Sequence, residues 1–301
     1  EIMPESLILQ DVRYMFPRAS GVYGADDYSN YVVDFEPTNR YAASLRSSHV
    51  NKIYYDPTVR YQPWSNADGS LMNNADPTCA PHNPLNTAAG CRNLTVNNTQ
   101  TARWLKSDGT RSSSQSKTFY PAVYFNYVSG SINDASSYTE IEIISSTASY
   151  VGGPNRSDCT AAPNCTYNEE IQNFANWYTY YRSRILLARA GIGRAFSAQG
   201  NTMRDGFAAM NKGSTTVDGA ATEVVKSGVR QFTGTDRSNF FTNLYDHDIP
   251  AAGTPLREAM IKVGEYFKRT DDKGPWGQTP GSSGGTQHEC RQNYNILMTD
   301  G

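Results

Sequence analysis

The sequence changes character at Thr166. Residues 1–165 show no helical periodicity and are dense in Asp-Pro, Asp-Gly, Asn-Pro and Gly-Gly pairs, so they predict loops and short strands. Residues 166–301 alternate helical periodicity with short apolar segments, a pattern typical of an α/β domain. We therefore expect two regions: a disulfide-containing region of loops and short strands over 1–165, and an α/β core over 166–301.

The α/β core is expected to begin with a long helix. Thr166 and Glu169 have the spacing of a capping box, in which the two side chains satisfy free backbone N–H groups at the helix start. Apolar residues then recur at three- and four-residue steps from Ile171 to Ala195, which predicts one helix of about 30 residues. Its opposite, polar face is expected to carry Gln172, Asn176, Thr179, Ser183 and Arg194.

The same patterns predict the remaining elements. They are a hairpin-like pair of strands at 123–128 and 138–144, strands at 203–210 and 228–232, helices at 236–244 and 254–267, and a strand at 294–299. The last of these is continuously apolar, which is typical of a strand buried in a parallel sheet. Helices that alternate with such strands favour a parallel sheet flanked by helices.

The composition argues against two classes of partner. The 27 Lys and Arg and the 29 Asp and Glu leave a formal charge of −2, so no global basic field exists to attract a nucleic-acid backbone. The most apolar helical stretch, residues 185–196, contains Arg189 and Arg194 and falls short of the roughly 20 apolar residues that a bilayer span needs. Polarity comes mainly from uncharged residues, as in secreted or surface proteins.

Five cysteines form two close pairs with one left over. Cys79 with Cys91, and Cys159 with Cys165, lie in loop-like segments, which favours two short-loop disulfides. A zinc site would need more closely spaced cysteines with a second pair or a histidine nearby. Cys290 is expected to be either buried and reduced or paired with a cysteine outside this sequence.

The ends of the sequence predict a piece of a longer protein. No charged and apolar leader is present at Glu1, so any signal peptide was removed or lies upstream. The sequence stops directly after an apolar run, at the point where a strand would be followed by its connection. The odd number of cysteines fits the same expectation.

Two loops of the α/β core carry hard oxygen donors. The run Ile-Leu-Met-Thr-Asp300-Gly301, with the upstream Ala-Ala-Gly253-Thr254-Pro255, resembles two of the three loops of the metal site called MIDAS in von Willebrand factor A domains. The resemblance implies a Rossmann-like parallel sheet flanked by helices, with Thr254 and Asp300 as direct or water-mediated ligands of Mg²⁺, or alternatively Ca²⁺ or Mn²⁺. The third loop, Asp-x-Ser-x-Ser, does not occur in this sequence, so both the site and the core are expected to be incomplete, the core without its first and last strands.

Longer strings narrow the resemblance. Segments 169–184, 245–257 and 290–301, with the Tyr-Asp-Pro-x-Val-x-Tyr-x-Pro-Trp stretch that ends at Trp64, resemble the N-terminal half of the type IV pilus tip family called PilC or PilY. This resemblance implies that the Asp-x-Ser-x-Ser loop lies upstream and that residues 1–165 are a large insertion near the metal face. It also implies a non-enzymatic adhesion and pilus-assembly factor of the bacterial surface, at the pilus tip or outer membrane, or secreted. Minor pilins and a host or other surface ligand are the expected partners.

Two other functions are alternatives. The aromatic, Ser- and Thr-rich insertion could bind glycan or matrix protein without a metal. A secreted hydrolase would need the run Gly281-Ser-Ser-Gly-Gly285 to be a nucleophile elbow, but a linker surrounds it in place of a strand and a helix. The run Gly191-Ile-Gly193 resembles half of a dinucleotide fingerprint but lies late in a helix, so we interpret it as a close helix-packing site.

Overall fold

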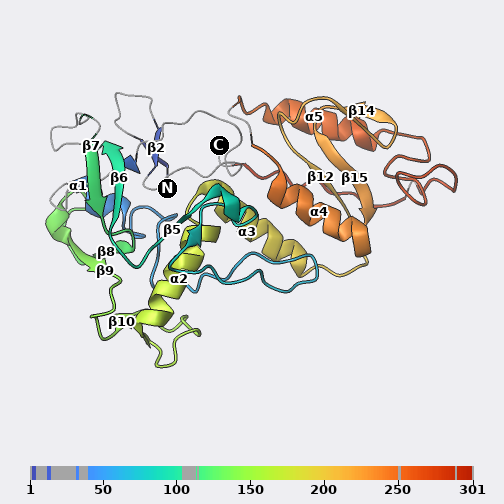
Figure 1. Cartoon of the computed structure of the whole chain (residues 1–301). Helices are drawn as coiled ribbons and strands as arrows, with labels where there is room; N and C mark the ends of the chain where they lie inside the picture. Colours follow the sequence, from blue (N-terminus) through green and yellow to red (C-terminus); the bar gives the residue numbers. More distant parts are fainter. Residues whose placement is uncertain are drawn as a thin grey trace. The chain divides into compact units, whose positions relative to one another are not determined.

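The computed structural model describes residues 2–4, 12–14, 32–33, 40–103, 113, 115–249, 252–288 and 290–299 (Figure 1). The chain divides into two units between Ile192 and Gly193, and residues 66–69 belong to the second unit. Unit 1 therefore includes the helix that follows Thr166, whereas the sequence places the boundary at 165/166. The reason is that this helix packs into the aromatic core formed by the residues before it.

Unit 1 consists of short strands and loops around that helix. A five-stranded sheet has the order β1 (Ile2–Pro4), β2 (Val12–Tyr14), β3 (Val32–Val33), β6 (Asn98–Arg103) and β7 (Gln115–Phe119). The β2–β3 and β3–β6 pairs are parallel, and the other two are antiparallel. Three antiparallel pairs join β4 (Ala80–Pro81) to β5 (Cys91–Arg92), β8 (Val123–Tyr127) to β9 (Tyr138–Glu142), and β10 (Tyr150–Val151) to β11 (Asn164–Cys165). Short helical segments lie at α1 (Arg40–Leu45), Thr87–Ala89 and Ala135–Ser137. The predicted strand pair at 123–128 and 138–144 is confirmed as β8 and β9.

The long helix predicted from Thr166 is two helices, α2 (Tyr167–Tyr180) and α3 (Arg184–Ser197). The capping box is confirmed, because the Thr166 N–H donates to Glu169 Oε2 at 2.7 Å and the Glu169 N–H donates to Thr166 Oγ1 at 3.4 Å. The single long helix is wrong because of Arg182, which lies fully buried between α2 and α3.

The guanidinium of Arg182 bonds to a backbone carbonyl that would accept an N–H in a continuous helix. Its Nη1 donates to the carbonyl of Tyr178 at 2.6 Å and its Nη2 to the carbonyl of His82 at 2.8 Å. A continuous helix would offer the Tyr178 carbonyl to the N–H four residues later. Ser183 then starts α3, since its hydroxyl accepts from the Leu186 N–H at 3.2 Å.

Aromatic side chains form the core of unit 1. Tyr54, Tyr55 and Trp64 are each at most 1% exposed, and Phe174 and Trp177 of α2 are fully buried beside them. The Tyr55 ring lies 4.9 Å from Phe174 and 5.9 Å from Trp177, centroid to centroid. Tyrosine and tryptophan side chains therefore pack this loop-rich region.

Unit 2 contains two antiparallel strand pairs and two further helices. The pairs are β12 (Arg204–Ala208) with β15 (Val225–Gln231) and β13 (Thr215–Val217) with β14 (Ala220–Thr222). The helices are α4 (Gly234–Asp246) and α5 (Leu256–Phe267). The strands predicted at 203–210 and 228–232 and the helices predicted at 236–244 and 254–267 thus form. A Cβ at Gly193 would overlap the Tyr245 hydroxyl, which supports the interpretation of that glycine as a close packing site.

The parallel sheet predicted within 166–301 is not formed by the described residues. The segment 294–299, predicted as a buried strand, has no sheet partner there and is exposed, with Tyr294 at 80% and Ile296 at 75%. A strand needs a neighbouring backbone to satisfy its N–H and C=O groups, and β12 and β15 pair only with each other. The described part of the chain is a mixed α/β fold with small sheets.

Both predicted disulfides are present. Cys79 is bonded to Cys91 and Cys159 to Cys165, while Cys290 is a free and exposed thiol. The alternative in which Cys290 is buried is therefore wrong. Within the part of the chain described, the helices lack the combination of length and apolar character that a bilayer crossing requires.

Candidate functional site

The predicted metal loops are only partly visible. Thr254 is exposed and irregular, immediately before Pro255 at the start of α5. Its carbonyl accepts from the Leu256 N–H at 2.8 Å, but its hydroxyl does not cap the helix. Asp300 lies outside the described residues. Among the residues that are described, no three His, Cys, Asp or Glu side chains are grouped as metal ligands, so they contribute one hydroxyl to the predicted site.

The most organised polar structure lies instead on α2, in unit 1. Its polar face is buried against extended backbone: Asn173 and Asn176 are 2% and 5% exposed. Asn173 accepts from the Tyr61 N–H at 2.7 Å and donates to the Val59 carbonyl at 2.9 Å. Asn176 donates to the Tyr61 carbonyl and accepts from the Ala75 N–H, both at 3.0 Å. Side-chain amides of α2 thus replace the neighbouring strand that these loop segments would otherwise need.

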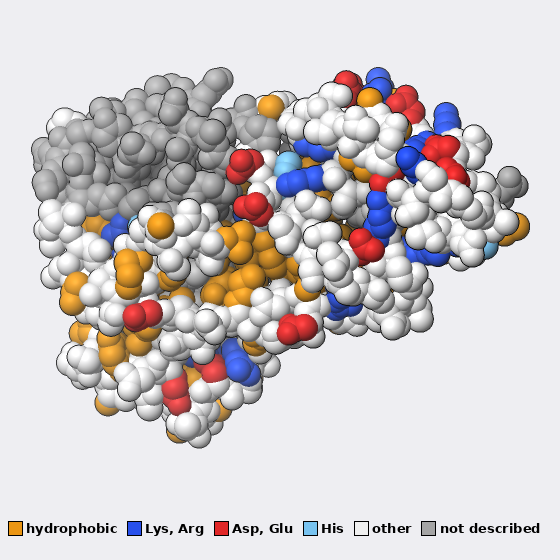
Figure 2. Space-filling view, turned by 45° about the vertical axis from the view of Figure 1, so that its right-hand side comes forward, with side chains coloured by type: hydrophobic (Ala, Val, Ile, Leu, Met, Phe, Trp, Pro, Cys, Tyr) orange, Lys and Arg blue, Asp and Glu red, His pale blue; other side chains and the backbone are white. Residues whose placement is uncertain are grey.

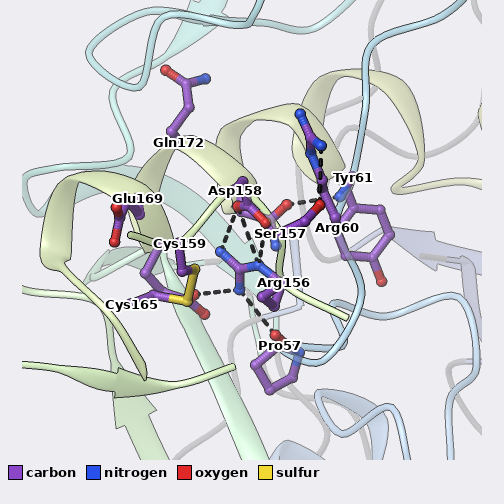
Figure 3. A network of polar contacts seen from close by, with 12 residues as sticks. Pro57, Arg60, Tyr61, Arg156, Ser157, Asp158, Cys159, Cys165, Glu169 and Gln172 are labelled. Carbon is purple, nitrogen blue, oxygen red and sulfur yellow. Dashed lines mark hydrogen bonds and ion pairs between the residues drawn. A yellow bond between two sulfur atoms is a disulfide. The ribbon is translucent and has the colours of Figure 1, made fainter. Parts of the chain in front are cut away.

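A buried ion pair lies one turn earlier on the same helix (Figure 3). Arg156 and Glu170 are fully buried, and Arg156 Nη1 lies 2.6 Å from Glu170 Oε2. The same guanidinium nitrogen donates to the Pro57 carbonyl at 2.9 Å, and Nε and Nη2 donate to the Asp158 carboxylate. The Tyr55 hydroxyl donates to the other oxygen of Glu170 at 2.7 Å. Every charged atom of this pair therefore has a hydrogen-bond partner.

The environment shifts the ionisation of these groups. Burial is the main cause that raises the pKa of Glu170, and the attraction of Arg156 opposes it. Burial, followed by the charge of Glu170, also raises the pKa of Tyr55 well above its usual range. The neighbouring Glu169 behaves in the opposite way, because backbone N–H groups of Thr166 and Thr160 lower its pKa to about 2. The Arg156–Glu170 pair is closed to solvent and to any substrate, so its role is structural. We call the cluster of Arg156, Glu170, Asp158 and Tyr55 the lock.

The lock ties three segments together. Arg156 and Asp158 come from the segment immediately before Cys159, and the Cys159–Cys165 disulfide lies beside them in Figure 3. Gly152 allows this segment to approach, because a Cβ there would meet both the Arg156 side chain and the Cys165 sulfur at 2.8 Å. The arrangement fixes the disulfide loop and the segment around Pro57 against the start of α2.

A polar groove of about 360 Å³ shares Asp158 with the lock. Its walls are the extended segments 60–63 and 71–74, and its floor is formed by side chains of α2. The floor residues are Gln172, Asn173 and Asn176. This groove combines uncharged donors and acceptors with a single Arg60 and a single Asp158, so it is suited to binding a neutral polar ligand and contains no nucleophile–base arrangement.

Surface charge is mixed. Over the described residues in view, Figure 2 shows Lys and Arg interspersed with Asp and Glu, without an extended region of one sign. This distribution agrees with the small formal charge of −2. The described residues on the face in view do not form the basic stripe that binding to a phosphate backbone requires.

The sequence predicted neither the lock nor the groove floor formed by the side-chain amides of Gln172, Asn173 and Asn176. The helical periodicity assigned Gln172 and Asn176 to the polar face of the helix, but it does not specify whether water or protein covers that face. The signal for burial was that aromatic residues also occur off the apolar face, at Trp177 and Tyr180, where a solvated helix would expose them. Nothing in the sequence paired Arg156 with Glu170.

Comparisons with known proteins identify relatives by sequence. The chain is 29% identical over 282 residues to the type IV pilus biogenesis factor PilY1 of Pseudomonas aeruginosa strain PAK, a match that covers 90% of this chain and 22% of that protein. It is 32% identical over 209 residues to PilY1 of P. aeruginosa strain PAO1, covering 60% of this chain and 18% of the relative. A third match, to PilY1 of strain UCBPP-PA14, is 30% identical over 140 residues, covering 45% of this chain and 11% of that relative.

Two further comparisons are negative. No protein-family model matches the chain, and no solved structure matches it. The chain spans about a fifth of the length of the first two relatives. Because the similarity to one relative extends over nine-tenths of this sequence, these matches support the predicted resemblance to the PilC/PilY family of type IV pilus biogenesis factors.

Proposed function

We propose that this protein acts in type IV pilus biogenesis at the bacterial cell surface, as a non-enzymatic module of the pilus tip that also takes part in adhesion. The similarity to PilY1 over 90% of the chain is the observation that carries this proposal. The two disulfides support it, since such bonds persist outside the cytoplasm. The proposed partners are minor pilins and a host or other surface ligand.

Unit 1 suits a role that requires a rigid surface for binding a partner. Its loops are held by side-chain amides of α2, by the buried Arg156–Glu170 pair and by two disulfides. These crosslinks keep a loop-rich surface in one shape, which lowers the entropy lost when a partner binds.

A segment exchange tests the pilus role. The aligned segment of P. aeruginosa PilY1 is replaced by this chain, and surface pili and twitching are measured in a strain that lacks native PilY1. We expect the chimera to restore both. A matched chimera carrying Arg156→Met should restore less, because the lock of unit 1 is broken. The proposal fails if the first chimera reaches the cell surface at the native level and yet restores neither pili nor twitching.

We also propose that Thr254 and Asp300 bind a divalent cation, Mg²⁺ first and Ca²⁺ or Mn²⁺ as alternatives. Hydroxyl and carboxylate oxygens are hard donors suited to these ions, and the Thr254 side chain is exposed and does not cap α5. In this proposal, residues 166–301 are part of a von Willebrand factor A-like core that the rest of a longer protein completes, including the Asp-x-Ser-x-Ser loop.

Calorimetric titration of each cation tests the metal proposal. It is carried out on this chain and on a longer segment that restores the upstream loop. We expect binding by the longer segment, abolished by Asp300→Ala and weakened by Thr254→Ala, with Thr279→Ala as the control at another threonine. The proposal is contradicted if the longer segment shows no heat of binding with any of the three cations.

A further inference from the structure

The polar groove of unit 1 lies between two chain segments that are bridged at one end and separated at the other. Ser65 and Leu71 form an antiparallel bridge, and the Met72 N–H donates to the Trp64 carbonyl at 2.8 Å. Beyond this point the two arms separate into the walls 60–63 and 71–74. The amide of Asn176 lies between them, with Nδ2 donating to the Tyr61 carbonyl and to Asn74 Oδ1, each at 3.0 Å. Gln172 supports the same arm by donating to the Ala75 carbonyl at 2.8 Å.

The backbone of the walls is largely used inside the protein. The N–H and the carbonyl of Tyr61 bond to Asn173 and Asn176. The carbonyls of Gln62 and Asn73 accept from the hydroxyls of Tyr181 and Tyr180. An extended peptide could therefore not add to these arms through a regular ladder of main-chain hydrogen bonds, which is the source of affinity in strand addition.

Side-chain amides are what the groove offers to a ligand. Within the described part of the chain, the amides of Gln62 and Asn73 have no hydrogen-bond partner, and the same holds for Asn74 Nδ2 and Gln172 Oε1. Gln62 and Asn73 each present a planar donor and acceptor side by side, whereas Asn74 offers a donor and Gln172 an acceptor. Vicinal hydroxyls and acetamido groups present the complementary pattern.

Charge and size narrow the ligand class. Arg60 and Asp158 contribute opposite charges to the lining, so the groove favours no ionic ligand. Its volume of about 360 Å³ lies at the small end of ligand sites, which suits one or two sugar rings. Pro63, Leu71 and Met72 add apolar surface to the walls, against which the methyl group of an acetamido substituent can pack.

We infer that this groove binds a neutral oligosaccharide containing N-acetylhexosamine. The inference goes beyond the pilus function and does not depend on the metal proposal, because no lining residue belongs to the predicted metal loops. It assigns the contacts with ligand to Gln62, Asn73, Asn74 and Gln172, while Asn176 positions the walls.

Binding of chitotriose and cellotriose to the full 301-residue chain tests the inference. These trisaccharides share the same linkage and differ in the acetamido groups, and saturation-transfer NMR titration reports their affinities. We expect chitotriose to bind at least about tenfold more tightly, the effect of one or two hydrogen bonds gained with the acetamido group. Binding should persist in EDTA. A separate titration with the neutral disaccharide N-acetyllactosamine, compared with chitotriose, distinguishes a host-type glycan from chitin as the source.

Variants locate the site. Gln62→Ala and Asn73→Ala should each weaken chitotriose binding about two- to tenfold, with unchanged unfolding midpoints because neither side chain bonds to the protein. Asn97→Ala, an exposed amide outside the groove, is the matched control and should bind like the wild type. The inference is overturned if chitotriose shows no saturable binding, if cellotriose binds equally well, or if the two groove variants bind like the wild type.

Discussion

Replacing Arg156 by Met breaks the buried ion pair from one side. Met fills much of the same volume but cannot donate a hydrogen bond, so it leaves the Glu170 carboxylate buried with the Tyr55 hydroxyl as its remaining donor. The Pro57 carbonyl and the Asp158 carboxylate lose their guanidinium partners as well. Removal of one partner of a buried pair costs about 3–5 kcal/mol of unfolding free energy, and we expect a loss in this range at pH 8.

The loss should depend strongly on pH. Arg156 holds the pKa of Glu170 down against the raising effect of burial, so the pKa rises further in the variant. A carboxyl whose pKa is raised by folding contributes stability that is fully present below its unfolded pKa of about 4.3 and is lost as pH rises through the folded pKa. The difference between variant and wild type should therefore grow by up to about 1.4 kcal/mol per pH unit over that window.

Urea unfolding followed by tryptophan fluorescence at pH 5 and pH 8 measures both effects. Trp64 and Trp177 are buried in unit 1 and report its unfolding. Arg60→Met is the control, because Arg60 is exposed and has a single hydrogen bond, to Ser157. Glu170→Gln should show little pH dependence, since it removes the titrating group. Equal losses for Arg156→Met at the two pH values would refute the reasoning.

Three further perturbations follow from the structure. Asn176→Leu should lower the unfolding free energy of unit 1 by about 2–4 kcal/mol in urea titrations, because it leaves buried groups such as the Tyr61 carbonyl without partners; a loss under 1 kcal/mol would contradict the role of this amide. Replacing Cys159 and Cys165 by Ser opens a short loop and should cost about 2 kcal/mol by the same assay, whereas no change would show that the lock holds the loop alone. Burial, together with nearby arginines, lowers the pKa of His82 to about 4, so its imidazole should stay neutral in an NMR pH titration until that pH. Because folding favours the neutral form, its contribution to stability is present above pH 6.5 and is lost as pH falls toward 4; titration near pH 6.5 would contradict this.

Local signals predicted β12, β15, α4 and α5 of unit 2 and the start of α2. The capping box at Thr166 and Glu169 depends on residues three positions apart, so the sequence contains all of the information. The strand at 294–299 was predicted from its apolar composition and did not form, because a strand depends on a distant partner that composition does not specify. The length of the helix after Thr166 failed for the same kind of reason, since Arg182 bonds to His82, 100 positions earlier.

The sequence by itself determined where α2 begins and which cysteines pair, because these depend on neighbouring residues. It also indicated the resemblance to the PilC/PilY family through matching strings. Only the tertiary structure decided that the polar face of α2 is buried and that Arg156 pairs with Glu170. Side-chain amides can bond equally well to water or to the backbone of a distant loop. Residue type therefore does not specify whether these amides bond to water or to backbone. The aromatic core packs against α2 and excludes water, so the amides bond to the backbone of the loops.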